Sequence, residues 1–118
     1  VGKKAIVIDD EIATGGSIIE LLNKLEEFGC QEASVCTTHG LFSGKAVERL
    51  QGHHMISEVV TTNTVPQNHE AFDKLEVRSV ANLFAEAIRR THDGKSVSKL
   101  FRGVDPQYAP PPVPGEGA

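Results

Sequence analysis

The stretch that most constrains the fold is an apolar run from Ala5 to Ile8, which Asp9 and Asp10 end. An apolar run with no polar position is typical of a strand that is buried on both faces of a parallel sheet. A turn with two glycines follows, and large aliphatic residues then recur from Ile18 onward at helical spacing. The sequence therefore predicts a central strand, a glycine turn and a helix, in that order.

The turn, Ala13 to Ser17, has the features of an anion site. The first N–H groups of a helix have no intrahelical partner and lie at the positive end of its dipole, so they suit a phosphate. Gly15 and Gly16 carry no Cβ that would hold an anion away from the backbone. The alternative is a purely structural turn, but two carboxylates and two hydroxyl residues at one strand end favour binding.

The two aspartates narrow the choice of ligand. Carboxylates do not bind phosphate directly, so Asp9 and Asp10 are expected to act on what is attached to it: sugar hydroxyls, a bound Mg²⁺, or both. A phosphorylated sugar is therefore the predicted ligand. The candidate binding residues are Asp9, Asp10, Ala13, Thr14, Gly15, Gly16 and Ser17.

The rest of the chain predicts further α/β elements. Helices are expected at 16–28, ending at Gly29, and at 44–50, after a Ser43 cap. A third helix is expected after a Ser79 cap, with its apolar face in the core. Strands are expected at 33–37, 59–62 and 75–79. This order predicts an α/β fold with a mainly parallel sheet flanked by helices. Loops at the carboxyl ends of parallel strands converge, so His39 is expected near the aspartates, as a ligand or in a structural role.

Two other α/β folds share part of this pattern. A receiver domain also has an acidic cluster after a strand, but it needs an aspartate at a later strand end, where this chain has Thr38 and Asn63. A dinucleotide-binding fold needs a G-x-G-x-x-G turn, which the sequence lacks. Neither alternative fits the residues.

Composition and charge limit the partners. The chain has 118 residues, of which 39% are hydrophobic and 24% charged, as expected of one globular domain. A net charge of −4 with scattered basic residues argues against nucleic acid, and no apolar run approaches the roughly 18 residues of a membrane span. Cys30 and Cys36 are expected to be reduced thiols in a cytoplasmic protein. His53 and His54 are adjacent and are not expected to form a metal site.

Several motifs resemble one enzyme family. Residues 9–17 match Asp-Asp-x-x-x-Thr-Gly-Gly-Ser, which resembles the phosphoribosyl pyrophosphate (PRPP) loop of type I phosphoribosyltransferase-fold proteins. Four later segments follow in order: Thr38–Gly44, Thr62–Gln67, Ala85–His92 and Ser96–Phe101. Together they resemble the C-terminal half of ribose-phosphate pyrophosphokinases (PRPP synthetases). The resemblance implies a phosphoribosyltransferase-like domain over residues 1–103 of a longer enzyme, and the Pro/Gly-rich segment 104–118 is expected to be a disordered tail.

The resemblance also implies an activity, namely ribose-phosphate diphosphokinase. Such enzymes transfer diphosphate from ATP to C1 of ribose 5-phosphate with Mg²⁺, giving PRPP and AMP. Ala13 to Ser17 would hold the 5-phosphate and the two aspartates the ribose hydroxyls, although Ala13 stands where many members have aspartate. The catalytic loop and most ATP contacts of the family lie upstream, so no catalytic residue is expected here. Alternatives are a phosphoribosyltransferase, a non-catalytic regulatory homologue, or a scaffold with an empty site.

Regulation and assembly are implied in the same way. Serines of a Ser-Val-Ser segment line an intersubunit regulatory site for phosphate and ADP in the family, so Ser96 and Ser98 are implied to form an allosteric anion site. Nearby Arg89, Arg90 and Lys95 could add positive charge. Family members assemble from dimers into hexamers, which implies a homo-oligomer.

Overall fold

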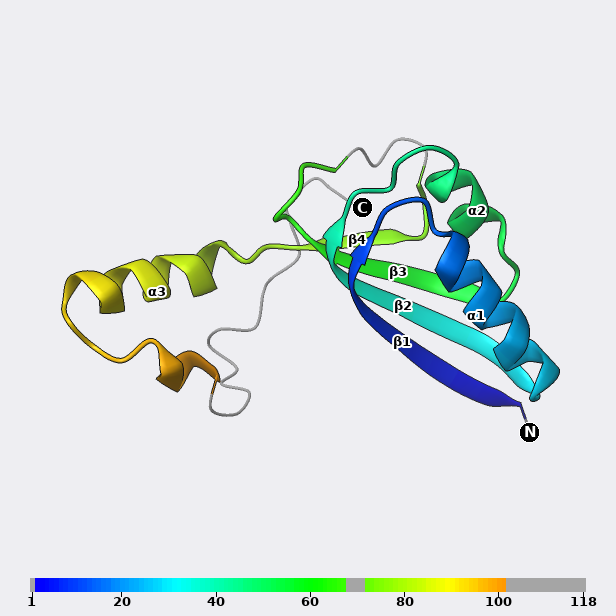
Figure 1. The fold of residues 1–118 in the computed structure, drawn as a ribbon, viewed down its shortest axis with the longest axis horizontal. Helices are drawn as coiled ribbons and strands as arrows, with labels where there is room; N and C mark the ends of the chain where they lie inside the picture. Colours follow the sequence, from blue (N-terminus) through cyan, green and yellow to red (C-terminus); the bar gives the residue numbers. More distant parts are fainter. Residues whose placement is uncertain (1, 68–71, 102–118) are drawn as a thin grey trace.

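The computed structural model describes residues 2–67 and 72–101. In these residues, four strands and three α-helices follow in the predicted order and a short 3₁₀ helix comes last (Figure 1): β1 Lys3–Ile12, α1 Gly16–Glu27, β2 Cys30–Gly40, α2 Ala46–Gly52, β3 Ile56–Thr62, β4 Leu75–Arg78, α3 Ala81–His92 and η1 Ser98–Phe101. The tail expected at 104–118 lies outside the described residues. So does the end of the domain expected over residues 1–103.

The strands form one parallel sheet in the order β1-β2-β3-β4, which confirms the predicted class. One row of apolar residues runs across all four strands in register: Val7, Val35, Val59 and Leu75. Because side chains of a strand alternate between faces, this row and its neighbours two residues away define the buried face of the sheet. The second and third strands begin earlier than predicted, at Cys30 and Ile56.

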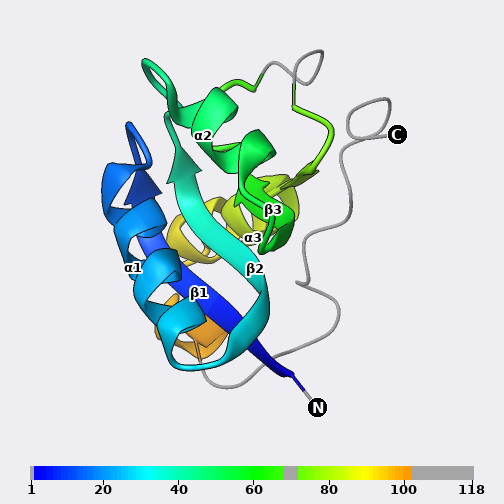
Figure 2. The same cartoon turned by 90° about the vertical axis from the view of Figure 1, so that its right-hand side faces the viewer.

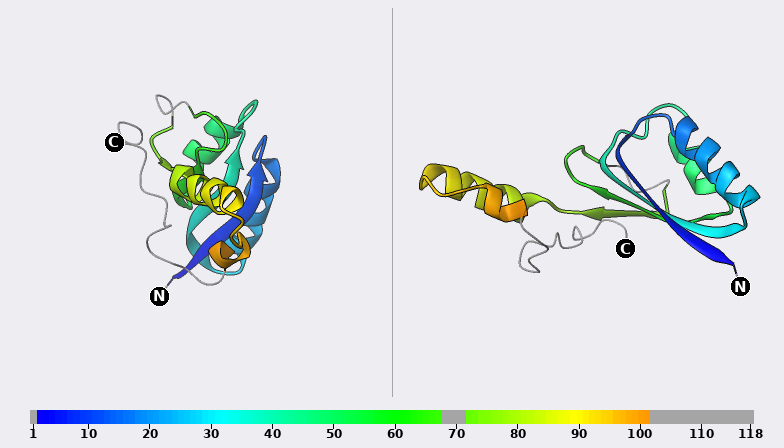
Figure 3. Two further views of the ribbon diagram at one scale, coloured as in Figure 1. Left: turned by 90° about the vertical axis from the view of Figure 1, so that its left-hand side faces the viewer. Right: turned by 60° about the horizontal axis from the view of Figure 1, so that its bottom comes forward.

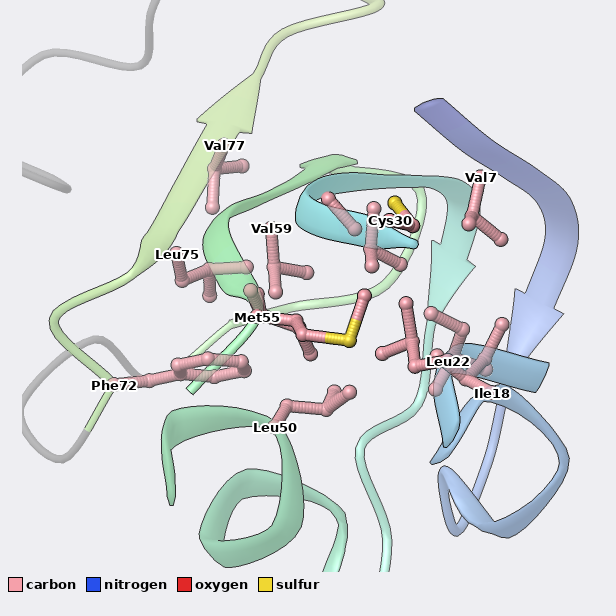
Figure 4. Packing of buried hydrophobic residues seen from close by; sticks show 14 residues of the cluster. Val7, Ile18, Leu22, Cys30, Leu50, Met55, Val59, Phe72, Leu75 and Val77 are labelled. Carbon is pink, nitrogen blue, oxygen red and sulfur yellow. The ribbon is translucent and has the colours of Figure 1, made fainter. Parts of the chain in front are cut away.

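Helices α1 and α2 cover that buried face (Figure 2). Ile18 and Leu22 of α1 and Leu50 of α2 are in the core cluster. Met55 and Phe72 fill the space between α2 and the strands, and both are almost fully buried (Figure 4). This packing fixes the positions of both helices against the buried face of the sheet.

In the part of the chain that the structure describes, the opposite face of the sheet is uncovered, which contradicts the prediction that the first strand is central and buried on both faces. Within the described residues β1 is an edge strand, with β2 as its one neighbour. Ile6 and Ile8 are 73% and 79% exposed. The apolar run therefore predicts burial on both faces, but in the described chain only the face with Val7 is buried.

Helix α3 corrects a second prediction, because it does not pack into the core. It extends away from the sheet (Figures 1 and 3), and it contains no buried residue. Phe84 and Ile88, on the predicted core face, are 54% and 70% exposed. The helical pattern is confirmed, whereas its burial is wrong. No helix in the described part of the chain is long and apolar enough to span a bilayer.

The helix ends also test the sequence pattern. Gly29 has a φ of 89°, which confirms the left-handed stop after α1. The predicted Ser43 cap is wrong: Gly44 turns at a φ of 58°, α2 begins at Ala46, and the carbonyl oxygen of Ser43 accepts the Ala46 N–H bond. The N-cap residue of α3 is Val80 and not the predicted Ser79, although Ser79 Oγ accepts a bond from the N–H group of Ala81, the first residue of the helix.

Candidate functional site

The loop between β1 and α1 forms a pocket of about 340 Å³ that is lined by residues 9–18. All seven predicted binding residues line it. The loop lies at the carboxyl end of the parallel sheet, where ligands of open α/β folds bind. The predicted binding residues thus share one pocket, and ligand binding by these residues stays a prediction.

Gly15 sets the path of the loop. It is the N-cap residue of α1 and has a φ of 79°, in the left-handed region that favours glycine. A Cβ built on it would lie 3.7 Å from the Cα of Ala46 on α2, at ordinary contact distance. Its conformation, more than lack of space, therefore explains why glycine stands here.

The backbone carbonyl groups of residues 12–15 all accept hydrogen bonds. The carbonyl of Ile12 accepts from the N–H groups of Leu41 (3.0 Å) and Phe42 (3.2 Å), and the carbonyl of Ala13 accepts from the N–H of Ser43 (2.8 Å). The guanidinium of Arg49 donates to the carbonyl of Thr14 (2.9 Å). The N–H of Ile19 donates to the carbonyl of Gly15 (3.1 Å). Three of these four acceptors are bonded by the segment that follows β2. The β2–α2 connection and α2 therefore hold one side of the loop.

The N–H groups of the loop are consequently free on its other side. In a trans peptide the C=O and N–H groups point in opposite directions, so engaging the carbonyls of residues 12–15 turns the N–H groups of residues 13–16 away from their partners. Within residues 2–67 and 72–101, no acceptor bonds the backbone N–H groups of residues 13–18. This row of unpaired donors at a helix N-terminus is an arrangement that suits an anion.

The two aspartates lie at the mouth of the same pocket with exposed side chains. The backbone N–H of Asp10 donates to Asp9 Oδ1 (2.8 Å), and in the described chain neither carboxylate forms an ion pair. Carboxylate oxygens therefore remain available to hydroxyl donors or a cation. No group of three or more His, Cys, Asp and Glu side chains gathers in the described residues, so a metal held here would need further oxygens from ligand or water.

His39 lies beside this loop but does not line the pocket. It pairs with Glu11 across β1 and β2, as the convergence of the strand ends predicts. Its Nδ1 lies 2.8 Å from the hydroxyl of Thr64, which also donates to the carbonyl of Thr38 (3.1 Å). Of the two roles left open by the sequence, the contacts favour the structural one, which ties the end of β2 to the turn after β3.

Ser96 and Ser98 lie beyond α3, on the part of the chain that extends away from the sheet (Figure 1). Their hydroxyls are 2.7 Å apart, and Arg90 donates to the carbonyl of Ser96 (3.2 Å). Glu86 binds both Arg89 and Arg90, and its bond to Arg89 is the main reason why its pKa is lowered. The arginines near the serines thus already share a carboxylate, and the regulatory anion site stays a prediction.

Arg49 is the residue of the site that the sequence prediction missed. It lies three residues after Ala46 and one before Leu50, so it shares the face of α2 that packs toward the β1–α1 loop. The helical spacing could have indicated that Arg49 lies on the packed face of α2. Its contact with Thr14, 35 residues away in the chain, is not visible in any local pattern.

Comparison with known proteins supports the family resemblance. A family model described as the phosphoribosyl synthetase-associated domain matches residues 1–102. A ribose-phosphate pyrophosphokinase of Caldanaerobacter subterraneus subsp. tengcongensis is 52% identical over 101 residues, which cover 85% of this chain and 32% of that protein. One of Clostridium acetobutylicum is 48% identical over 102 residues, 86% of this chain and 32% of that protein.

The fold agrees with these relatives. The crystal structure of phosphoribosylpyrophosphate synthetase from Mycobacterium smegmatis superposes with a TM-score of 0.73 at 38% identity, covering 79% of this chain and 31% of that one. The chain spans about a third of the length of the curated relatives it matches. It therefore belongs to the phosphoribosyl synthetase-associated domain family and matches one part of ribose-phosphate pyrophosphokinases in sequence and fold.

Proposed function

We propose that this chain supplies the ribose 5-phosphate site of a ribose-phosphate diphosphokinase, as its C-terminal phosphoribosyltransferase-like domain over residues 1–103. The complete enzyme would transfer diphosphate from ATP to the C1 hydroxyl of ribose 5-phosphate, giving PRPP and AMP. The observation that carries this proposal is a row of N–H groups at residues 13–18 with no acceptor among the described residues, beside two aspartates that form no ion pair there. A phosphate matches the former and a sugar diol the latter.

In this proposal the 5-phosphate lies against the N–H groups of the loop, with the hydroxyls of Thr14 and Ser17 as further donors. Asp9 and Asp10 accept hydrogen bonds from the ribose hydroxyls. Phosphoryl-type transfer gains mostly from alignment and charge neutralisation, so a rigid grip on ribose contributes by fixing the attacking C1 oxygen. The chain's role is therefore to bind and orient the acceptor.

Mg²⁺ fits the same residues as a proposed cofactor. Magnesium sites in phosphoryl-transfer enzymes take one or two carboxylates and complete their coordination with phosphate oxygens and water. Asp9 and Asp10 have exposed oxygens and no ion-pair partner among the described residues. When bound, the ion would supply charge neutralisation for the diphosphate.

ATP binding and the catalytic loop are proposed to come from parts of the enzyme that this chain does not match. We therefore expect the chain by itself to bind ribose 5-phosphate or PRPP weakly and to have no transfer activity. The complete enzyme is proposed to act in the cytoplasm as a homo-oligomer of dimers that form a hexamer.

Titration with ribose 5-phosphate tests the proposal. The folded chain should bind it, and Asp9→Asn should weaken binding by about tenfold, since one charge-assisted hydrogen bond is lost. Asp93→Asn, which removes an exposed carboxylate at the end of α3, is the matched control and should bind as the wild type does. Absence of binding to a folded wild type, or an equal loss in both variants, would contradict the assignment.

A further inference from the structure

Arg49 makes a contact that bears on the proposed phosphate loop. Its guanidinium Nη1 donates to the backbone carbonyl of Thr14 at 2.9 Å. The same nitrogen lies 3.7 Å from the position of a Cβ on Gly16. The guanidinium therefore lies directly behind the glycine pair that lines the pocket.

The helix that carries Arg49 is held firmly against this loop. Ala46 and Leu50, at three positions before and one after Arg49, are fully buried. Both also lie at contact distance, 3.7–3.8 Å, from the position of a Cβ on Gly15. Because these two residues fix the face of α2, the backbone of Arg49 has a set position relative to Thr14.

The charge of Arg49 is directed at the loop rather than at an acid. Among the residues that the structure describes, no carboxylate forms an ion pair with Arg49. A hydrogen bond from a charged donor is stronger than a neutral one, and it polarises the peptide that accepts it. The N–H group in that peptide belongs to Gly15 and points the opposite way, toward the pocket.

We propose that Arg49 is a positioning residue for the phosphate loop: it holds the Thr14 carbonyl back, so that the Gly15 N–H faces the pocket as a polarised donor to a phosphate dianion. The proposal rests on the function proposed above and deepens it. Arg49 itself does not touch the ligand in this arrangement. It acts through one peptide group, and its positive charge behind the loop favours a phosphate over an uncharged sugar.

Three variants test this role. Arg49→Gln removes the charge and the charged donor, Arg49→Lys keeps the charge, and Lys45→Gln removes an exposed charge from the start of the same helix without touching the loop. Binding of ribose 5-phosphate and of inorganic phosphate should each weaken about tenfold in Arg49→Gln, less in Arg49→Lys, and by less than about twofold in Lys45→Gln. The thermal midpoint without ligand should fall by only what the loss of one exposed hydrogen bond costs, so that each variant is still folded when binding is measured.

Two results would overturn the proposal: undiminished phosphate binding by Arg49→Gln, or an equal loss in Lys45→Gln, which would assign the effect to net charge. A second measurement separates this failure from failure of the proposed function. The ¹⁵N NMR resonance of the Gly15 amide should shift in Arg49→Gln and stay in place in Lys45→Gln, with no ligand present. If the wild type binds neither probe, the proposed function fails, and the Gly15 resonance alone then decides whether Arg49 orients the loop.

Discussion

Helices α1 and α3 have the same length, 12 residues, and both carry an apolar stripe, but they differ in what covers the stripe. Helix α1 places Ile18 and Leu22 in the core, against the sheet and α2. Helix α3 leaves its stripe exposed and is held by ion pairs within itself, from Glu86 to Arg89 and Arg90. An amphipathic pattern thus identifies a face that favours burial, and the rest of the fold decides whether a partner is present.

The difference also separates the two anion sites implied by the sequence. The β1–α1 loop is held from behind by the segment after β2, so its donors have fixed directions. Ser96 and Ser98 follow α3 and make their contacts with each other and with Arg90. A preorganised site gains affinity because less freedom is lost on binding, so the loop is the stronger candidate of the two.

The largest expected effect tests the packed helix. Leu22→Ala should lower the free energy of unfolding by about 2–5 kcal/mol, because Leu22 is fully buried and its truncation leaves a cavity in the core. Denaturant unfolding, followed by far-UV circular dichroism, measures this loss. A change under about 1 kcal/mol would contradict the packing of α1 on the sheet.

Two glycines with positive φ sharpen the comparison further. Gly15→Ala and Gly94→Ala place a side chain at φ values of 79° and 68°, each at an intrinsic cost of about 1–2 kcal/mol. Gly15 lies in the packed loop, so its variant should lose that amount in global unfolding and also bind ribose 5-phosphate less well. Gly94 follows the exposed α3, so its variant should change the global transition little; equal losses would show that α3 unfolds with the core.

The dependence of stability on pH tests a contact that α1 has and α3 lacks among the described residues, namely the one with His53. His53 Nδ1 accepts a bond from the Met55 N–H, and Nε2 lies 3.2 Å from Asn23 of α1, so the neutral ring fits this site. Partial burial, and next the neighbouring His54, lower the pKa of His53 below its usual 6.5. The folded state therefore binds the proton less readily than the unfolded chain, and stability falls as pH decreases from about 6.5 to the lowered pKa.

This loss should be small, below about 1 kcal/mol, because the ring is partly exposed and solvent screens its charge. Urea midpoints of the wild type and His53→Gln at pH 7.5 and 5.5 would measure it. His53→Gln should show a flatter pH dependence over this interval. If the urea midpoints of both proteins changed equally with pH, the pH dependence would come from other groups. The contact of His53 with α1 would then not distinguish the two helices.

The sequence predicted those features that depend on neighbouring residues. The order of elements followed from the apolar run and the glycine turn, and the candidate pocket followed because its lining residues, 9–18, are contiguous. The register that aligns Val7 with Leu75 across the sheet, and the reach of Arg49 to Thr14, join distant segments and could not be read from local periodicity.

The errors have a common physical cause. The exposed face of β1 and the exposed stripe of α3 were both predicted to be buried, because their residues are apolar. Burial needs a second surface, and hydrophobicity alone does not say where that surface is. The failed Ser43 cap differs, since the left-handed turn at Gly44 moved the helix start beyond the reach of the hydroxyl.

The smallest expected effect completes the comparison of the two helices. Ile88→Ala should change the free energy of unfolding by less than about 0.5 kcal/mol, because the side chain is 70% exposed and its truncation opens no cavity. It is the counterpart of Leu22→Ala, a large aliphatic residue cut to the same methyl group in a helix of equal length. The same denaturant titration measures both, at several protein concentrations. A loss above about 1 kcal/mol that grows with protein concentration would mean that another copy of the chain covers the α3 stripe in solution, and the two helices would then differ only in whose surface they pack against.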